Sequence, residues 1–468
     1  MSKLGKVILF TIFALSILLR FSLALVNREM NDDHMETLNI ITQQGRLPDK
    51  SDCWECAHPK LFYSLAAAVL KGFSINDPMQ RIEAVQMLNF LVSLPMILFL
   101  WLFIRSLDFV TDQLKLLTFG LLALNPAFVG INAQATNDTF VITFSIIALY
   151  FARQLIEHKR AWQLLLTILF SVLSILSKTN GLIPAFAIGL AFLLEALARR
   201  DFSLRWGRSN LLLAGVYGLS VLTIVTITPL SQYISNYQKY GSPLALNMTV
   251  PPQPFPYFFE KTDTFKAGIL SIQDGFFTFK FLDLLVEPQT TTGNRPFPPH
   301  RTSFWTILYG RAHFVQYNQW PPSWVTTSNA IRWLGRVLYI FALLPTLALL
   351  TGIIVETRNL FRWLWKGESA VPRPASAGLF LVLWIAILIF DMAMALEFRM
   401  FNNIKPIYAY PAIPSLAVLS IIGWNTLETR FLKTSPRIRS LLISSMAFLV
   451  ALYALDSAVL FIQLLFPG

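Results

Sequence analysis

Long apolar runs recur along the chain, separated by short polar stretches. The runs are long enough to cross a hydrocarbon layer of roughly 30 Å as helices of about 20 residues, and they lack the strict alternation of barrel strands. We therefore expect an all-α polytopic membrane protein with about 11 transmembrane helices. The expected spans lie near residues 6–26, 84–104, 116–131, 139–155, 161–176, 181–198, 211–230, 331–355, 376–396, 406–424 and 440–464.

Basic residues gather in every second loop between these spans. With a cytoplasmic N-terminus, one set of short loops carries Arg105, Lys115, Arg153, Lys159, Arg160, Arg199, Arg200, Arg205, Arg208, Arg358, Arg362, Lys366, Arg373, Arg430, Lys433, Arg437 and Arg439. The alternate short loops hold only Lys178, Arg399 and Lys405. This bias is the positive-inside pattern, so it predicts that the loop after the first span lies outside the cytoplasm.

Composition agrees with a membrane protein. The chain has 468 residues, of which 55% are hydrophobic and 14% charged, and its mean hydropathy is +0.55, which excludes an ordinary soluble protein. The net charge of +12 follows from the basic cytoplasmic loops, so no nucleic-acid partner is expected. The first run, 6–26, has a basic start but no small-residue cleavage pattern, which predicts a retained span.

Two external segments are too long to be simple connections. The first, 27–83, belongs to an expected N-terminal transmembrane catalytic module, 1–230. The second, 231–330, is expected to be a lid on the acceptor side, followed by C-terminal transmembrane helices over 331–468. No internal repeat is found, which argues against a transporter built from inverted halves.

The first external loop carries two helical patterns of its own. Asn31 can cap a helix in which Met35, Leu38 and Ile41 share one side, and Gly45 ends it. This pattern predicts an amphipathic helix on the membrane face. The apolar run 61–70 is too short to span, so we expect a second interfacial or re-entrant helix.

Candidate chemistry begins directly after the first span, at Asp32, Asp33 and His34. Acidic and imidazole groups are costly to hold near hydrocarbon unless they serve chemistry or lie in a solvated loop. An alternative is that the two aspartates complement the dipole of a capped helix. Chemistry is favoured because further polar groups are expected on the same side of the membrane, namely His58, Lys60, Asp138 and Lys178.

Two other external features have more than one interpretation. Cys53 and Cys56 are the only cysteines, and a local disulfide is the leading interpretation, with a metal pair involving His58 as the alternative. The segment 231–330 is rich in aromatic residues, which suggests a lid that touches lipid, sugar or acceptor. Its candidate contact residues are His313, Tyr317 and Trp320. A loop that only packs over the bundle remains the alternative.

Six short motifs follow one another along the chain. They are Asp32-Asp33-His34 after the first span, His58-Pro59-Lys60-Leu61-Phe62-Tyr63, Arg81-Ile82-Glu83 opening the second span, Leu124-Asn125-Pro126 leading to Asn137-Asp138, Lys178-Thr179-Asn180-Gly181-Leu182, and Arg399 ahead of Tyr408 to Pro414. In this order they resemble the C-type multi-pass glycosyltransferases that use polyprenyl-phosphate sugars, especially the group of bacterial protein O-mannosyltransferases and the lipid A aminoarabinose transferase. Lys60 departs from the pattern, in which a second proline stands there, and the long external segment has no motif of the family.

The resemblance implies a polyprenyl-phosphate or polyprenyl-diphosphate sugar as donor and an acceptor hydroxyl on a protein, lipid or glycan. Transfer needs a base for the acceptor proton and positive charge for the leaving phosphate. We expect Asp32 to be the base, with Asp33 positioning it or serving as a second acid, and Asp138 orienting the acceptor. The cations expected at the donor phosphate are His58, Lys60, Lys178 and Arg399.

The sequence allows more than one interpretation of the cofactor, the membrane in which the protein lies and the class of function. Asp32, Asp33 and Asp138 offer oxygen ligands that suit Mg²⁺ or Mn²⁺, although cations alone can neutralise a phosphate. A bacterial inner membrane with a periplasmic site is expected from the resemblance. Two glycosylation sequons, at Asn137 and Asn247, leave an endoplasmic reticulum membrane open. A transporter or flippase, and a non-catalytic binder of lipid-linked sugar, are the competing functions.

Overall fold

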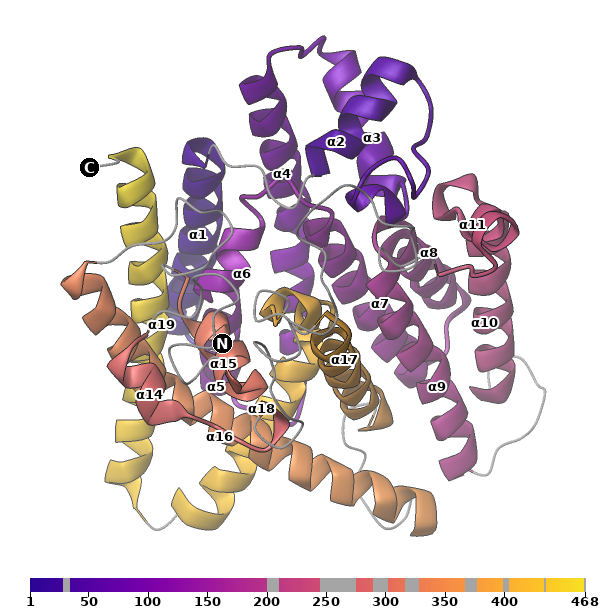
Figure 1. Ribbon diagram of the computed structural model, residues 1–468. Coiled ribbons are helices and arrows are strands. Elements are labelled where there is room, and N and C mark those ends of the chain that lie inside the picture. Colours follow the sequence, from indigo (N-terminus) through magenta and orange to yellow (C-terminus); the bar gives the residue numbers. More distant parts are fainter. Residues whose placement is uncertain are drawn as a thin grey trace.

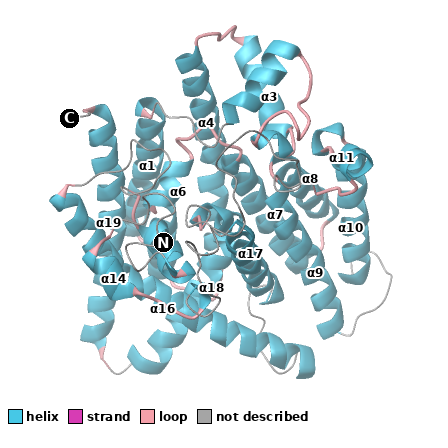
Figure 2. Ribbon diagram, in the orientation of Figure 1, coloured by secondary structure: helices cyan, strands magenta, loops and turns pink. Residues whose placement is uncertain are grey.

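The computed structural model describes residues 1–27, 34–199, 210–244, 275–288, 302–315, 328–366, 377–398, 404–432 and 435–466. Over these residues every regular element is a helix (Figure 2). The all-α prediction is therefore confirmed. Helices suit this chain because each one satisfies its own backbone hydrogen bonds, which a bilayer core cannot do for it.

Most of the long helices form one bundle, and α16 crosses it obliquely (Figure 1). The long helices, with α16 among them, are α1 (Lys3–Val26), α4 (Pro78–Arg105), α7 (Asp138–His158), α8 (Ala161–Ser177), α9 (Leu182–Arg199), α10 (Asn210–Ile227), α16 (Asn329–Lys366), α17 (Ala377–Phe398), α18 (Ile413–Leu427) and α19 (Pro436–Leu465). Nine helical stretches in the described part are long and apolar enough to cross a membrane. The protein is thus an integral membrane protein.

The predicted span over 116–131 is wrong as a single helix. The chain there forms α5 (Asp112–Ala123) and α6 (Pro126–Ile131), with a break at Asn125. Proline has no N–H to continue a helix, and the Asn125 side chain instead accepts the N–H of Phe128 at 3.0 Å. Because α8 also falls short of a full span at 17 residues, the expected count of 11 spans is not confirmed.

Both expected helices of the first external loop are present. Residues of α2 (His34–Asn39) run into a π-helical turn, Ile40–Gln44, which ends at Gly45 in the left-handed conformation (φ 68°). Met35 and Leu38 are buried against α3 (Leu61–Gly72). The two helices lie together at the end of the bundle where α4 begins (Figure 1).

Arg20 and Asp456 are ionisable residues inside spans, and both are fully buried. Arg20 of α1 donates to the Ser16 hydroxyl at 2.5 Å and to the Ala123 carbonyl at 2.8 Å. Asp456 of α19 accepts the backbone N–H of Val315 at 3.1 Å. These hydrogen bonds to hydroxyl and backbone groups offset part of the cost of burying charged side chains inside the bundle.

Candidate functional site

A buried hydrogen-bond network joins the first external loop to the ends of α7 and α8. Asp138, the first residue of α7, accepts the Lys178 ammonium at 2.6 Å on Oδ1 and the Thr136 hydroxyl at 2.8 Å on Oδ2. The Thr136 oxygen also lies 3.1 Å from His34 Nε2, and His34 Nδ1 lies 2.7 Å from the Tyr63 hydroxyl. Four separate segments of the chain therefore meet around one carboxylate.

The chemistry of these groups determines the direction of each hydrogen bond. An ionised carboxylate only accepts, so Thr136 donates its one proton to Asp138. Its oxygen must then accept from His34 Nε2–H, which leaves Nδ1 of a neutral imidazole to accept from Tyr63. The network thus runs from Tyr63 through His34 and Thr136 to Asp138, with His34 held as the Nε2–H tautomer.

Local structure explains why Asp138 and Lys178 meet. The antiparallel helices α7 and α8 are joined by a short turn, so the start of α7 lies beside the end of α8, where Lys178 stands. The turn after Lys178 folds back closely on α8, since a Cβ on Gly181 would come within 2.6 Å of the Ser174 carbonyl oxygen. Only glycine fits there, which gives the Lys-x-x-Gly motif a physical reason.

Burial changes the protonation behaviour of the network. It lowers the pKa of His34 to about 3, because an imidazolium would lose its hydration there. Burial also disfavours a charged Lys178, but the Asp138 carboxylate together with Tyr408 and Glu55 outweighs it and raises the pKa of Lys178. The site at neutral pH therefore combines a neutral imidazole with an ion pair.

We expect His34 to make the protein sensitive to acid. The unfolded chain binds a proton near pH 6.5 and the folded chain only near pH 3, so stability is lost as the pH falls through this window. Between pH 7 and pH 5 the loss should be about 2 kcal/mol. Unfolding of wild type and His34→Gln in detergent at both pH values measures it. An equal loss in the two proteins would contradict the assignment.

A disulfide-closed turn lies against this network. Cys53 and Cys56 are joined, with their Cα atoms 5.0 Å apart, and Glu55 stands between them on a 3₁₀ turn, Glu55–Ala57. The Glu55 Oε2 atom lies 2.9 Å from His58 Nε2 and 3.8 Å from His34 Nδ1. The turn therefore brings a buried carboxylate to two histidines.

Of the four cations predicted at the donor phosphate, three lie in the described part of the chain, and each has its own partner there. Lys178 is paired with Asp138, and His58 with Glu55. Lys60 is buried and donates to the backbone carbonyls of Cys56 at 2.5 Å and His58 at 2.7 Å. Burial lowers the pKa of Lys60 to about 7, although nearby carboxylates oppose this. Arg399 lies outside the described residues.

The other predicted site residues are only partly covered by the described part of the chain. Asp32 and Asp33, as well as Tyr317 and Trp320, lie outside the described residues, so only Asp138 of the predicted carboxylates is seen. Over the described residues no group of three His, Cys, Asp or Glu side chains could hold a metal ion.

His313, predicted on the lid, packs on the bundle at the end of α15 (Phe304–His313). Its Nδ1 lies 2.5 Å from the hydroxyl of Tyr453 in α19, on which its ring stacks at 6.0 Å between centroids. The carbonyl of the neighbouring Ala312 accepts from Asn125 at 2.7 Å. His313 therefore anchors the external segment to the helices, where its imidazole is paired with α19.

The sequence-based search missed several members of the site. Tyr63, Thr136 and Glu55 were not among the predicted site residues, and His34 was named beside Asp32 and Asp33 without a role of its own. A hydroxyl two residues before Asp138 and a carboxylate inside Cys-Trp-Glu-Cys were the available signals. Tyr408 was missed as well, although its ring lies 5.9 Å from the Lys178 ammonium.

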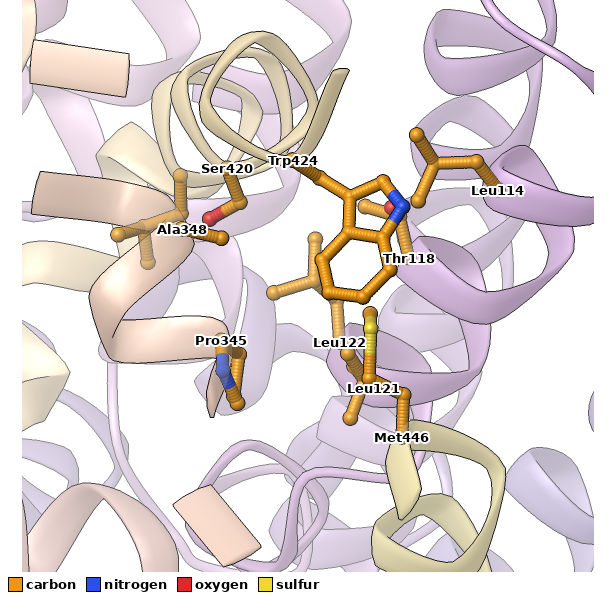
Figure 3. A pocket seen from close by; sticks show the side chains of 10 residues that line it. Leu114, Thr118, Leu121, Leu122, Pro345, Ala348, Ser420, Trp424 and Met446 are labelled. Atoms are coloured by element: carbon orange, nitrogen blue, oxygen red, sulfur yellow. The ribbon is translucent and has the colours of Figure 1, made fainter. Parts of the chain in front are cut away.

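The cavity drawn in Figure 3 is a separate feature. It holds about 50 Å³ and is lined mainly by apolar side chains of α5, α16, α18 and α19, among them Leu121, Pro345 and Trp424. Thr118 and Ser420 contribute its two hydroxyls. No residue of the Asp138 network lines it, and the space is far too small for a sugar, so it is not the candidate site.

Comparison with known proteins agrees with the motif pattern. The model of the dolichyl-phosphate-mannose-protein mannosyltransferase family matches residues 59–226, which include Asp138 and Lys178. The resemblance to the C-type glycosyltransferase superfamily is thereby confirmed over this part of the chain. Among curated proteins no sequence match was found.

Similar solved structures are remote in sequence. ArnT from Cupriavidus metallidurans bound to undecaprenyl phosphate is 15% identical, with a TM-score of 0.46 and coverage of 98% of this chain and 76% of that one. Archaeal oligosaccharyltransferase AglB from Archaeoglobus fulgidus, in complex with an inhibitory peptide and a dolichol-phosphate, is 16% identical, with a TM-score of 0.45 and coverage of 98% and 56%. The apo form of the A. fulgidus oligosaccharyltransferase is 14% identical, with a TM-score of 0.48 and coverage of 99% and 56%. The chain thus spans little more than half the length of the archaeal protein.

Proposed function

We propose, from the match of residues 59–226 to the mannosyltransferase family, that the protein is a membrane glycosyltransferase. It moves a sugar from a polyprenyl-phosphate or polyprenyl-diphosphate donor to an acceptor hydroxyl outside the cytoplasm. The observation that carries the proposal is the buried Asp138 network, because it gathers a carboxylate, an ammonium and an imidazole inside the matched region and beside the first external loop.

In the proposed reaction the acceptor oxygen attacks the anomeric carbon while the bond from that carbon to the phosphate oxygen breaks. The acceptor proton passes to Asp32, and the polyprenyl phosphate leaves with the electron pair. Asp33 positions this base, and His34, the next residue in the chain, ties the segment to Asp138 through Thr136. A carboxylate at an apolar bilayer edge is a better base than one in water, because desolvation destabilises its charge.

The leaving phosphate requires positive charge on the same side of the membrane. We assign this role to His58, Lys178 and Arg399, of which arginine suits bidentate phosphate binding. Lys60 stabilises the backbone turn that carries His58, because its ammonium donates to two backbone carbonyls of that turn. Preorganised charges of this kind stabilise a leaving group without reorganisation at the moment of reaction.

The residues present do not fit a divalent cation at Asp138. Lys178 occupies Oδ1 at 2.6 Å and Thr136 donates to Oδ2, so a metal ion there would face a buried ammonium at short range. The proposed transfer therefore uses no metal ion at Asp138, and we expect EDTA to leave transfer unchanged.

The acceptor side and the location complete the proposal. The acceptor is a hydroxyl on a protein, a lipid or a glycan, and the donor tail lies among the spans with membrane lipids. We assign the protein to a bacterial inner membrane, with its N-terminus cytoplasmic and the site facing the periplasm. The asymmetry of basic loops supports this orientation.

The experiment uses purified wild type in nanodiscs with a panel of radiolabelled polyprenyl-phosphate sugars and candidate acceptors. Asp32→Asn should reduce transfer about 10²- to 10⁴-fold, the usual contribution of a general base. Asp52→Asn is the matched control, because Asp52 lies in the same loop and pairs with Arg46 on the surface. Full activity of Asp32→Asn would move the base to Asp33 or Asp138. If no donor is consumed, substrate-driven ion flux in proteoliposomes would favour a transporter.

A further inference from the structure

The carboxylate of Glu55 is unusually placed for a residue of an external loop. Only 6% of its surface is exposed, and its Oε2 atom lies within 4 Å of a nitrogen of both His34 and His58. The Nδ1 atom of His34 accepts from Tyr63 and has no proton to give. Of these two imidazoles, His58 is therefore the one with a ring nitrogen free to pair with Glu55, at 2.9 Å.

The backbone around Glu55 is tied down on both sides. A disulfide joins Cys53 to Cys56, three positions further along the chain. The two sulfur atoms lie 3.3 and 3.6 Å from the Thr37 hydroxyl of α2. On the other side the Lys60 ammonium donates to the carbonyls of Cys56 and His58. The disulfide is the covalent part of this arrangement, and Glu55 lies within the short loop that it closes.

We propose that Glu55 is a positioning residue for His58, and that the Cys53–Cys56 disulfide holds Glu55 in place so that reduction of this bond switches the site off. The inference rests on the proposed transferase function, in which His58 faces the donor phosphate. Glu55 acts through His58 and touches no substrate itself. The site would then work only in an oxidising compartment, which matches its expected external location.

The switching step balances with a dithiol as reductant. The dithiol supplies two electrons and two protons, the S–S bond breaks, Cys53 and Cys56 become thiols, and the reductant leaves as its own disulfide. Without the covalent closure, the turn can open and Glu55 can move away from His58. The chain has only these two cysteines, so no other thiol or disulfide contributes to the response.

The first test is a pair of substitutions at Glu55. Glu55→Gln keeps the size of the side chain and removes its charge, and it should lower transfer about 10- to 100-fold, mainly through a higher KM for the donor. Glu55→Asp retains the charge and should restore part of the loss. A purely structural role would give equal losses of transfer in Glu55→Gln and Glu55→Asp, or a lower Tm with KM and kcat affected alike. Either result would overturn the proposal.

The second test is reduction of the bond. Wild type treated with dithiothreitol should fall to the rate of the Cys53→Ala/Cys56→Ala variant, and that variant should not respond to dithiothreitol. Labelling with iodoacetamide, followed by mass spectrometry, verifies that the buried bond is open. Full activity of wild type with the bond open, or of the double variant, contradicts the switch.

A third readout does not depend on transfer. Diethyl pyrocarbonate modifies accessible imidazoles, and its reaction with His58 should increase several-fold on reduction and in Glu55→Gln, while His313, which is paired with Tyr453, serves as the internal reference. If the protein transfers no sugar from any donor, this readout still decides whether the disulfide controls His58. Unchanged modification of His58 on reduction overturns the inference by itself.

Discussion

Exchanging Asp138 for asparagine is expected to abolish most sugar transfer and to destabilise the protein. The carboxylate is 2% exposed and is paired at 2.6 Å with Lys178, which is buried as well. Asp138→Asn leaves the ammonium buried without its counter-charge, a change that typically costs about 3–5 kcal/mol. Transfer should fall at least about 100-fold in protein that remains folded, because asparagine offers one acceptor oxygen where Asp138 uses two, which disturbs the order of Thr136 and His34. Donor turnover and thermal unfolding in detergent measure the two effects.

A second variant separates charge compensation from chemistry. Asp138→Asn combined with Lys178→Met removes both charges, so much of the lost stability should return while transfer stays low. The matched single variant Lys178→Met completes the double-mutant cycle and gives the coupling energy of the pair. Recovery of transfer in the double variant would contradict two assignments, the role of Asp138 in orienting the acceptor and the role of Lys178 at the donor phosphate.

Gly423→Ala is expected to be the most damaging small change within the membrane. Gly352 of α16 and Gly423 of α18 lie where these helices are in close contact: a Cβ on Gly423 would overlap the Ala348 carbonyl oxygen, and one on Gly352 the Leu419 carbonyl oxygen. Small residues permit such close approach between membrane helices. The added methyl group meets backbone, which cannot rotate away, so the helices must separate. The loss should be about 1–3 kcal/mol or more.

The matched control for this substitution lies in another span. Gly218 of α10 has no atom within 4 Å of an added Cβ, so Gly218→Ala introduces the same methyl group into open space. It should leave the Tm unchanged or raise it slightly, since alanine favours a helix over glycine. Thermal unfolding and the yield of monodisperse protein report both variants. Equal stability of the two would disprove close α16–α18 packing.

Hydrophobic pattern alone was sufficient for the membrane class and for most spans. It succeeds because a helix in lipid satisfies its own backbone hydrogen bonds and exposes apolar side chains, so the local sequence is enough to locate it. The same holds for α2, whose apolar side was visible at helical spacing in Met35 and Leu38, and for α3, which was expected from the short apolar run 61–70. The wrong prediction at 116–131 also has a local cause. Hydropathy does not show that Pro126 cannot continue the preceding helix or that Asn125 caps the next one.

The arrangement of the site was decided by tertiary structure. Thr136 and His34 are 102 positions apart in the chain, and Asp138 and Lys178 are 40 apart, so only helix packing brings each pair together. Lys60 illustrates the limit of motif reasoning, since its position in a phosphate-binding pattern did not reveal that its ammonium bonds two backbone carbonyls. Sequence by itself thus determined the membrane helices and which residue types gather outside. Tertiary structure decided which charges are paired, because the direction of a long side chain and the protonation of a buried one depend on neighbours distant in the chain.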